Sequence, residues 1–228
     1  MKSNRVNAQY NVASSDSLAV KIAAHQRRKM YLAFLRVSAI GVEDTVLDVG
    51  ATSDQSYSHS NYLQAWYPHK SKITSVGLDD ASFLEEIYPG LTFVRADGRD
   101  LPFEDRSFDY VHSSAVIEHV GSRKMQTRFA QELWRVARKG VFVTTPNRWF
   151  PVEFHTVLPL LHWLPAPLFR KTLTALGREF FADEQNLNLL SSRGLMEAAA
   201  GAGLNDFRIT SVSLFGWPTN LLLFAQRR

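Results

Sequence analysis

The amino-acid sequence predicts an α/β fold in which a mostly parallel sheet is covered by helices on both faces and ends in an antiparallel hairpin. Short apolar segments rich in β-branched and aromatic residues alternate with helical patterns between residues 45 and 145. This alternation is typical of βαβ units, whose strands are buried on both faces. The last two apolar segments, 207–216 and 218–226, are so close in sequence that they must be antiparallel neighbours.

The elements are predicted in the following order. A helix over about 16–38 begins after Ser15 or Asp16, either of which can cap it. Strands are predicted at TVLDVG (45–50), KITSVGL (72–78), LTFVRA (91–96), FDYVHSS (108–114) and GVFVTT (140–145), with helices between them at 59–67, 81–88 and 123–137. An insertion over about 147–190, a helix around 192–203 and the hairpin complete the chain.

Composition favours one domain over residues 1–228, with a cofactor-binding core over about 44–146 and a terminal part over 192–228. The chain has no cysteine, which excludes disulfides and thiolate chemistry. It has no apolar run of about 20 residues, as a membrane span would need. The N-terminal segment is polar and unlike a secretion signal, so we expect a cytoplasmic protein, either monomer or homodimer.

The net charge of +4 is unevenly distributed. Basic residues gather in the first helix and at the last two positions: Lys21, Arg27, Arg28, Lys29, Arg36, Arg227 and Arg228. These residues could form a solvated helix face, or they could attract an anionic substrate or membrane surface in peripheral contact. Nucleic-acid binding is not expected, because no basic run is interleaved with aromatic residues.

Polar residues and glycines follow four of the predicted strands, at the edge where ligands bind in such sheets. The predicted cofactor-binding residues are Asp48, Gly50, Thr52, Asp54, Asp79, Asp80, Asp97, Gly98 and Ser114. Asp79 could accept hydrogen bonds from both ribose hydroxyls, and Asp97 could accept one from the adenine amine. The alternative is that such aspartates only form turns and cap helices.

The loop LDVGATSDQ (47–55) indicates which cofactor this edge would hold. A dinucleotide presents a pyrophosphate, which favours glycines and a helix N-terminus without nearby carboxylates. Here Thr52 and Asp54 stand where further glycines would be, and several carboxylates surround them. Because like charges repel in a partly dry site, the corner suits S-adenosylmethionine, which carries a sulfonium and an ammonium but no phosphate.

These residues carry a family resemblance. From Val46 to about Thr145 the chain resembles the class I S-adenosylmethionine-dependent methyltransferases, particularly the ubiquinone and menaquinone biosynthesis enzymes. The matching segments are VLDVG, GLDD, ADGRDLPFEDRSFDYVHSSAVIEHV and ELWRVARKGVFVTTPN. The resemblance implies a Rossmann-like, seven-stranded sheet, S-adenosylmethionine as cofactor and S-adenosylhomocysteine as product. The chain differs from the family at Thr52, which interrupts G-x-G, and at Lys139-Gly140, which replaces Pro-Gly-Gly.

Two histidines are the predicted catalytic residues. His119 follows the fourth strand and His155 follows the fifth, so either could act as general base toward an acceptor hydroxyl, or could simply pack. His59, Glu153 and His155 match no metal-site spacing, and no metal is predicted.

The apolar insertion after the fifth strand is predicted to form a lid and acceptor pocket, with Arg148, Trp149, Phe150 and Phe154 as substrate-binding residues. An extra core layer is the alternative for many of its side chains. The predicted function is therefore a methyltransferase acting on a small, hydrophobic or lipid-linked acceptor. Two alternatives are a non-catalytic protein that keeps the cofactor fold and a nicotinamide-dependent oxidoreductase.

Overall fold

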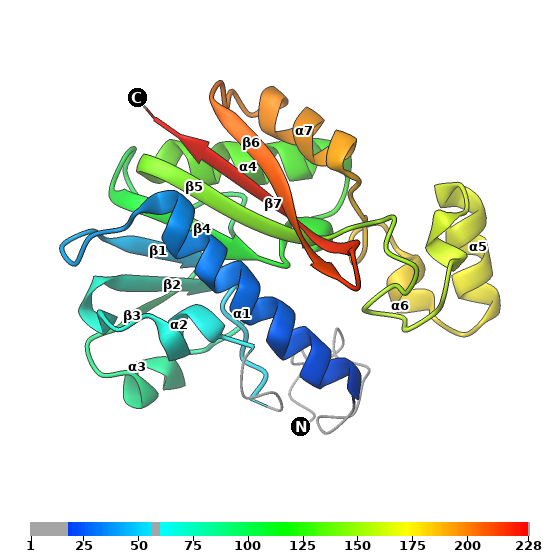
Figure 1. The fold of residues 1–228 in the computed structure, drawn as a ribbon, viewed down its shortest axis with the longest axis horizontal. Helices are drawn as coiled ribbons and strands as arrows, with labels where there is room; N and C mark the ends of the chain where they lie inside the picture. Colours follow the sequence, from blue (N-terminus) through cyan, green and yellow to red (C-terminus); the bar gives the residue numbers. More distant parts are fainter. Residues whose placement is uncertain (1–17, 56–59, 228) are drawn as a thin grey trace.

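A seven-stranded sheet with the strand order β3-β2-β1-β4-β5-β7-β6 forms the centre of the structure (Figure 1). It is a computed structural model that describes residues 18–55 and 60–227. The strands are β1 (Val46–Val49), β2 (Ile73–Gly77), β3 (Thr92–Arg95), β4 (Phe108–Ser114), β5 (Ala137–Pro146), β6 (Phe207–Leu214) and β7 (Trp217–Gln226). The first five are parallel, and β7 runs antiparallel to both β5 and β6. The predicted fold class is confirmed, including the terminal hairpin.

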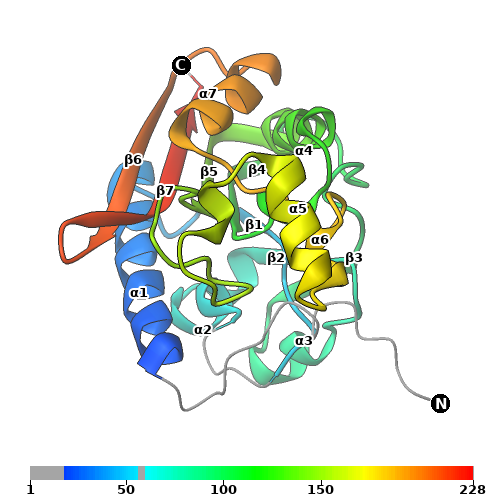
Figure 2. The same cartoon turned by 90° about the vertical axis from the view of Figure 1, so that its right-hand side faces the viewer.

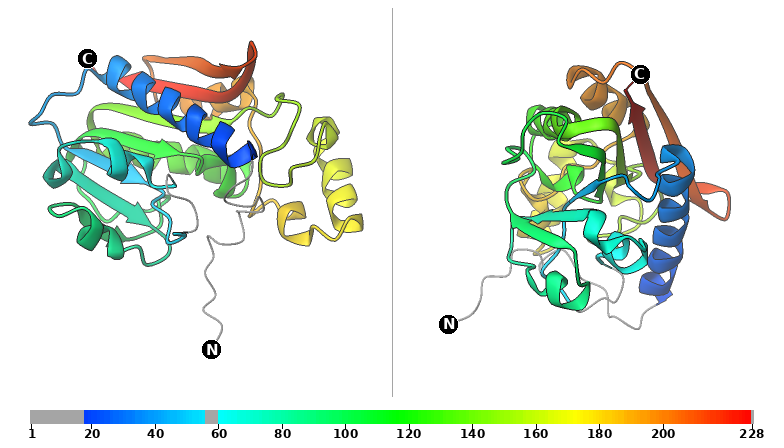
Figure 3. Two further views of the ribbon diagram at one scale, coloured as in Figure 1. Left: turned by 60° about the horizontal axis from the view of Figure 1, so that its bottom comes forward. Right: turned by 90° about the vertical axis from the view of Figure 1, so that its left-hand side faces the viewer.

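Helices cover both faces of the sheet (Figures 1 and 3). One face carries α1 (Leu18–Ser38), α2 (Tyr62–Trp66) and α3 (Phe83–Ile87), and the other carries α4 (Arg123–Val136) and α7 (Ser192–Gly201). Short 3-10 helices are η2 (Lys70–Lys72), η3 (Ile117–His119) and η4 (Leu161–Trp163). Among the described residues, no helix has the length and apolar character needed to cross a membrane.

The two apolar layers follow from the alternation of side chains along each strand. In β1, Leu47 and Val49 belong to the cluster under α4 and α7, whereas Val46 belongs to the cluster under α1 to α3. In β5, Val143 and Phe142 divide between the layers in the same way. Asp48, between Leu47 and Val49, therefore points toward the face covered by α2.

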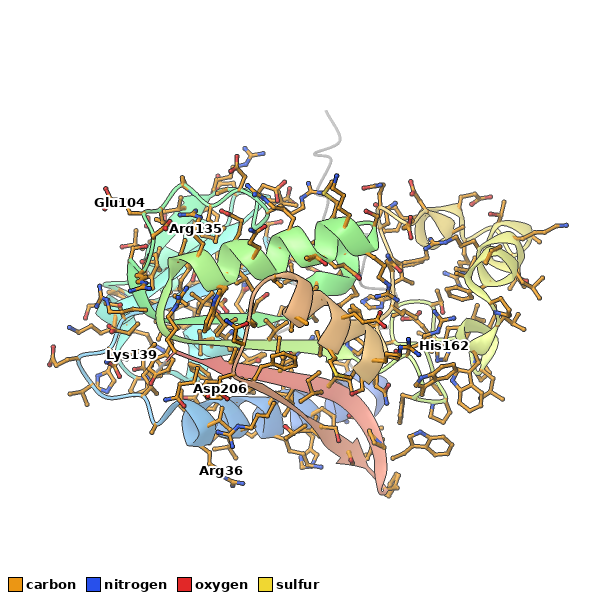
Figure 4. The ribbon with its side chains drawn as sticks, turned by 90° about the horizontal axis from the view of Figure 1, so that it is seen from above. Arg36, Glu104, Arg135, Lys139, His162 and Asp206 are labelled. Carbon is orange, nitrogen blue, oxygen red and sulfur yellow. The ribbon has the colours of Figure 1, made fainter. Side chains whose placement is uncertain are left out.

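The insertion over 147–190 lies beyond the carboxyl end of β5 and contains η4, α5 (Ala166–Ala175) and α6 (Glu179–Ala182), which face the viewer in Figure 2. It has its own apolar cluster of Phe169, Leu173, Phe181, Leu187 and Leu189. Figure 4 shows His162 of the insertion at one end of the molecule, with Glu104, Lys139 and Asp206 toward the other. The insertion is thus a small helical unit at the edge of the sheet where the predicted site residues lie.

Candidate functional site

A cavity of about 420 Å³ opens at the carboxyl ends of β1, β2 and β4. Its walls include part of the predicted cofactor set together with both predicted catalytic histidines: Gly50, Thr52, Asp97, Gly98, Ser114, His119 and His155. These residues come from separate strand ends and from the insertion. The cavity lies where ligands bind in parallel α/β sheets.

The turn after β1 requires glycine at its first position. The backbone N–H groups of Gly50 and Ala51 both donate to the Val76 carbonyl, at 2.8 Å, which folds the turn against β2. Gly50 has a φ of +115°, and a Cβ at this position would lie 2.1 Å from a methyl carbon of Val116. Only glycine fits this backbone without strain.

A side chain holds the loop where the family has its second glycine. The Thr52 N–H donates to Oδ1 of Asn61 at 2.9 Å, and Nδ2 of Asn61 donates to the Thr52 carbonyl at 3.0 Å. This reciprocal pair fixes the backbone at Thr52 from the start of α2. Asn61 was not among the predicted site residues, because a lone asparagine before a helix has no distinctive spacing.

The end of β3 contributes a carboxylate and a second glycine to the cavity. Asp97 accepts hydrogen bonds from the Arg99 backbone N–H at 2.8 Å and from its guanidinium at 2.6 Å, and these bonds lower the pKa of Asp97. A Cβ on Gly98 would lie 2.5 Å from the Phe129 ring and 2.8 Å from Val49. The backbone therefore passes close to the floor of the cavity at this point.

Asp48 does not line the cavity. Its carboxylate is buried and accepts hydrogen bonds from Nε2 of Gln64 and Nδ1 of His112, both at 2.5 Å. The Tyr62 hydroxyl, whose pKa burial raises, donates to Nε2 of the same histidine at 2.9 Å. Since Tyr62 lines the cavity, Asp48 supports one wall of it from behind.

Three further predicted acids, Asp54, Asp79 and Asp80, are not part of the cavity lining. Asp79 accepts a hydrogen bond from the Ser53 hydroxyl at 3.3 Å, and Asp80 accepts one from the Ser82 N–H at 2.9 Å. Asp54 is buried, with 7% of its surface exposed, and its N–H donates to the Thr52 hydroxyl. Cofactor contact at Asp48, Asp54, Asp79 and Asp80 stays a prediction.

His119 and His155 form a hydrogen-bonded pair. Their Nε2 atoms are 3.0 Å apart. The Nδ1–H of His119 donates to the Asn186 carbonyl at 2.7 Å, and the Nδ1–H of His155 donates to Oε1 of Glu153 at 2.7 Å. With both Nδ1 atoms acting as donors, the proton between the rings belongs to one Nε2 and the other accepts it.

The charges of the pair follow from their surroundings. Burial lowers the pKa of His119 to about 3, and the charge of His155 acts in the same direction. Burial alone would lower the pKa of His155, but the Glu153 carboxylate raises it above its ordinary value. For Glu153 burial opposes the charge of His155, which prevails and lowers its pKa to about 2. Of the two rings, His155 therefore holds a second proton more readily, and His119 is the one that more readily stays neutral.

Glu118 lies beside this pair, in η3. Its Oε2 accepts a hydrogen bond from the Thr145 hydroxyl at 2.9 Å, and its Oε1 is 3.8 Å from Nε2 of His119. The side chain is fully buried, and within the described part of the chain Oε1 has no hydrogen-bond partner. Burial raises the pKa of Glu118 to about 7.

The predicted substrate-binding residues of the insertion do not line the cavity. The Arg148 guanidinium donates to the Leu164 carbonyl at 2.9 Å, and the Phe150 and Phe154 rings stack with centroids 5.3 Å apart. Trp149 is 49% exposed and packs edge-on against Trp163. Their role in acceptor binding stays a prediction.

Other cavity residues had no signal in the sequence. Arg27 comes from α1, and Gln185 and Asn186 come from the end of the insertion. Their positions depend on how α1 and the insertion pack against the sheet, which a local pattern does not reveal. Arg27 belongs to the basic group of α1, so one of those charges lies at the cavity and not on the outer face of the helix.

Comparison with known proteins agrees with this arrangement. Residues 47–144 match the family model described as a methyltransferase domain. No curated protein sequence matches the chain. Among solved structures, an S-adenosylmethionine-dependent methyltransferase from Methanosarcina mazei is 18% identical, with a TM-score of 0.53 over 85% of this chain and 96% of that chain.

Two further structures share the fold. A methyltransferase of the same cofactor class from Mesorhizobium loti is 16% identical, with a TM-score of 0.57 over 87% of this chain and 98% of that one. Magnesium protoporphyrin IX methyltransferase from Synechocystis, solved with bound S-adenosylhomocysteine, is 12% identical, with a TM-score of 0.59 over 99% and 94%. The Rossmann-like fold and the resemblance to class I S-adenosylmethionine-dependent methyltransferases are confirmed, whereas the particular resemblance to ubiquinone and menaquinone biosynthesis enzymes stays a prediction. Residues 47–144 thus match a methyltransferase domain, and the chain shares the fold of enzymes that use S-adenosylmethionine.

Proposed function

We propose that the chain is an S-adenosylmethionine-dependent methyltransferase acting on a small hydrophobic or lipid-linked acceptor. The observation that carries the activity is the cavity at the carboxyl ends of β1, β2 and β4, within the segment that matches the methyltransferase domain. Gly50, Asp97 and Ser114 line it from the ends of β1, β3 and β4 in that segment. In this proposal the methionine part of the cofactor lies against the loop at Gly50, and the adenosine part extends toward Asp97.

Calorimetry with S-adenosylmethionine, S-adenosylhomocysteine and NAD tests the cofactor and the two alternative functions. We expect the first two ligands to bind and NAD not to bind. Replacement of Asp79 by alanine should weaken the binding of S-adenosylhomocysteine by about 2–3 kcal/mol if this carboxylate accepts hydrogen bonds from both ribose hydroxyls. Binding of NAD would favour the oxidoreductase, and cofactor binding without turnover on any acceptor would favour the non-catalytic protein.

The hydrophobic acceptor is supported by apolar side chains exposed on the insertion and the neighbouring hairpin. Trp149 and Leu160 are each 49% exposed, and Trp217 of the hairpin is 48% exposed. The indole N–H of Trp217 donates to the Trp149 carbonyl at 3.1 Å, so hairpin and insertion meet at this surface. Exposed apolar side chains of this kind suit an acceptor with an apolar body.

The acceptor class is tested by a double change, Trp149→Ala with Phe154→Ala, assayed on hydrophobic and sugar acceptors. We expect turnover on hydrophobic acceptors to fall while cofactor binding is retained. Because Trp149 is exposed, its replacement should leave the fold intact. An unchanged far-ultraviolet circular dichroism spectrum would show that lost turnover is not due to unfolding. Unchanged turnover would show that the acceptor binds elsewhere.

Peripheral contact with an anionic membrane is part of the same proposal. The Lys29 ammonium of α1 donates to the Ser213 carbonyl at 2.9 Å, which brings the basic helix beside the hairpin. At the hairpin tip Phe215 is 99% exposed. Exposed aromatic and basic groups together favour an anionic interface. Phe215→Ser should reduce co-sedimentation with phosphatidylglycerol vesicles, and equal co-sedimentation of both proteins would contradict the proposal.

A further inference from the structure

We propose that Glu118, His119 and His155 form a binding site for one divalent transition-metal ion, of the zinc class, in the wall of the cavity. Each residue offers one ligand atom, and the three atoms lie within 4.8 Å of one another. His119 and His155 line the cavity, and Glu118 lies directly behind them. The sequence predicts no metal, because His59, Glu153 and His155 match no metal-site spacing; His59 is outside the described residues.

The separations of the ligand atoms suit a common metal ion. The two Nε2 atoms are 3.0 Å apart, and Oε1 of Glu118 is 3.8 Å from Nε2 of His119. Ligands bound at 2.0–2.2 Å are about 2.8–3.1 Å apart at the right angles of an octahedron and about 3.3–3.6 Å apart in a tetrahedron. The nitrogen pair, at 3.0 Å, lies within the first of these ranges, and Oε1 of Glu118 lies within 4.8 Å of both nitrogens, so the Glu118 side chain would move toward them to complete the set.

The groups behind the ligands are those of a metal site. Metal-bound histidines usually donate their second N–H to a carboxylate or a carbonyl, which fixes the ring and directs the other nitrogen at the ion. His155 donates from Nδ1 to Glu153, and His119 donates from Nδ1 to the Asn186 carbonyl. These bonds leave the two Nε2 atoms facing one another, where a single ion could bind both.

Glu118 supplies an independent observation. Oε1 is buried and has no hydrogen-bond partner among the described residues, although buried carboxylate oxygens are nearly always bonded. A cation at the point where the two Nε2 atoms meet would satisfy this oxygen. The carboxylates of Glu118 and Glu153 would together balance its two positive charges. Mixed imidazole and carboxylate ligands favour zinc or a neighbouring transition metal over magnesium or calcium.

Three protein ligands leave further coordination positions, which catalytic sites fill with water or substrate. His119 and His155 line the cavity, so an oxygen of a bound molecule could occupy such a position. In that case the ion would orient an acceptor hydroxyl toward the methyl group of the cofactor. This role rests on the proposed function, whereas binding of the metal does not.

The test is calorimetry of the chelator-treated, dialysed protein with zinc chloride alone. We expect one ion per chain. Glu118→Gln, His119→Ala and His155→Ala should each lower the affinity at least about 100-fold, and Glu153→Gln should lower it about 10- to 100-fold through the orientation of His155. His25→Ala, which removes an exposed histidine of α1, is the matched control and should bind as the original protein does.

A measurement on the unaltered protein covers the case in which a variant fails to fold. With ¹⁵N-labelled histidine, zinc should shift the Nε2 resonances of His119 and His155 and leave that of His25 in place. Absence of stoichiometric binding, or binding that leaves both Nε2 resonances unchanged, overturns the proposal. S-adenosylhomocysteine calorimetry on the same samples separates the two proposals, because cofactor binding without zinc binding refutes the metal site alone.

Discussion

Replacement of Asp48 by alanine should destabilise the protein far more than it weakens cofactor binding. The change removes the acceptor of two buried hydrogen bonds, from Gln64 and from His112. Gln64 keeps its bond to the Ser75 hydroxyl at 2.8 Å, but one N–H of each partner loses its acceptor. An unsatisfied buried donor costs about 1–3 kcal/mol, so we expect a loss of about 2–5 kcal/mol in the free energy of unfolding.

The loss is large enough to measure in two ways. For a domain of this size it corresponds to a decrease of about 4–20 °C in the melting temperature. Urea unfolding at pH 7 gives the free energy directly. Calorimetry with S-adenosylhomocysteine at 25 °C should show an affinity within about 10-fold of the original, because Asp48 does not line the cavity.

The control is Asp105→Ala. Asp105 forms an exposed ion pair with Arg135 at 3.0 Å, and such pairs contribute about 0.2–1 kcal/mol. Asp48→Ala should therefore lower the free energy of unfolding several-fold more than Asp105→Ala does. If Asp48→Ala were as stable as the original but bound the cofactor much more weakly, the supporting role assigned to this carboxylate would be wrong.

Two further predictions concern the floor of the cavity and the helix beneath it. Gly98→Ala should lower the free energy of unfolding by about 1–3 kcal/mol and weaken the binding of S-adenosylhomocysteine, because the added methyl group meets the buried Phe129 ring. A melting temperature equal to that of the original protein, both with and without the ligand, would contradict this. Glu132→Gln should cost about 1–3 kcal/mol at pH 7. Burial alone would raise the pKa of Glu132, but hydrogen bonds from Arg135 and the Leu101 N–H lower it, so its contribution is present above about pH 4.3 and is lost as the pH falls below that value. Urea unfolding of the original protein and of Glu132→Gln, from pH 7 to pH 3, should show their difference in free energy of unfolding becoming smaller as the pH falls. A difference that stays constant would refute the stabilising role assigned to the Glu132 carboxylate.

The fold could be predicted because its signals are local and repeated. The apolar segments at 45–50 and 140–145 became β1 and β5, and the amphipathic segment at 123–137 became α4. Gly50, Asp97 and Ser114 could be placed for the same reason, since the end of each parallel strand must lie at one edge of the sheet. Position relative to a strand end was sufficient to bring them to one cavity.

Orientation and long-range packing set the limits of the prediction. Asp48 lies within β1, two residues before Gly50, but the alternation of side chains turns it toward α2 and away from the cavity. The meeting of His119 with His155 depends on the path of the insertion, which brings Glu153 and Asn186 to opposite sides of the pair. That path is set by the packing of apolar side chains within 147–190, and no spacing along the sequence encodes it.

The strand order has a consequence for the biosynthesis of the protein. β7 lies between β5 and β6, so β6 has no place in the sheet until residues 217–226 have left the ribosome. Until then β5 exposes an unpaired edge, from Gly140 to Pro146, to every nascent or misfolded chain nearby. A ribosome that stalls before Trp217 would hold a chain in which this edge of β5 is still unpaired. Chaperone contact during translation should concentrate in that interval, and ribosome profiling of chaperone-bound nascent chains would reveal it.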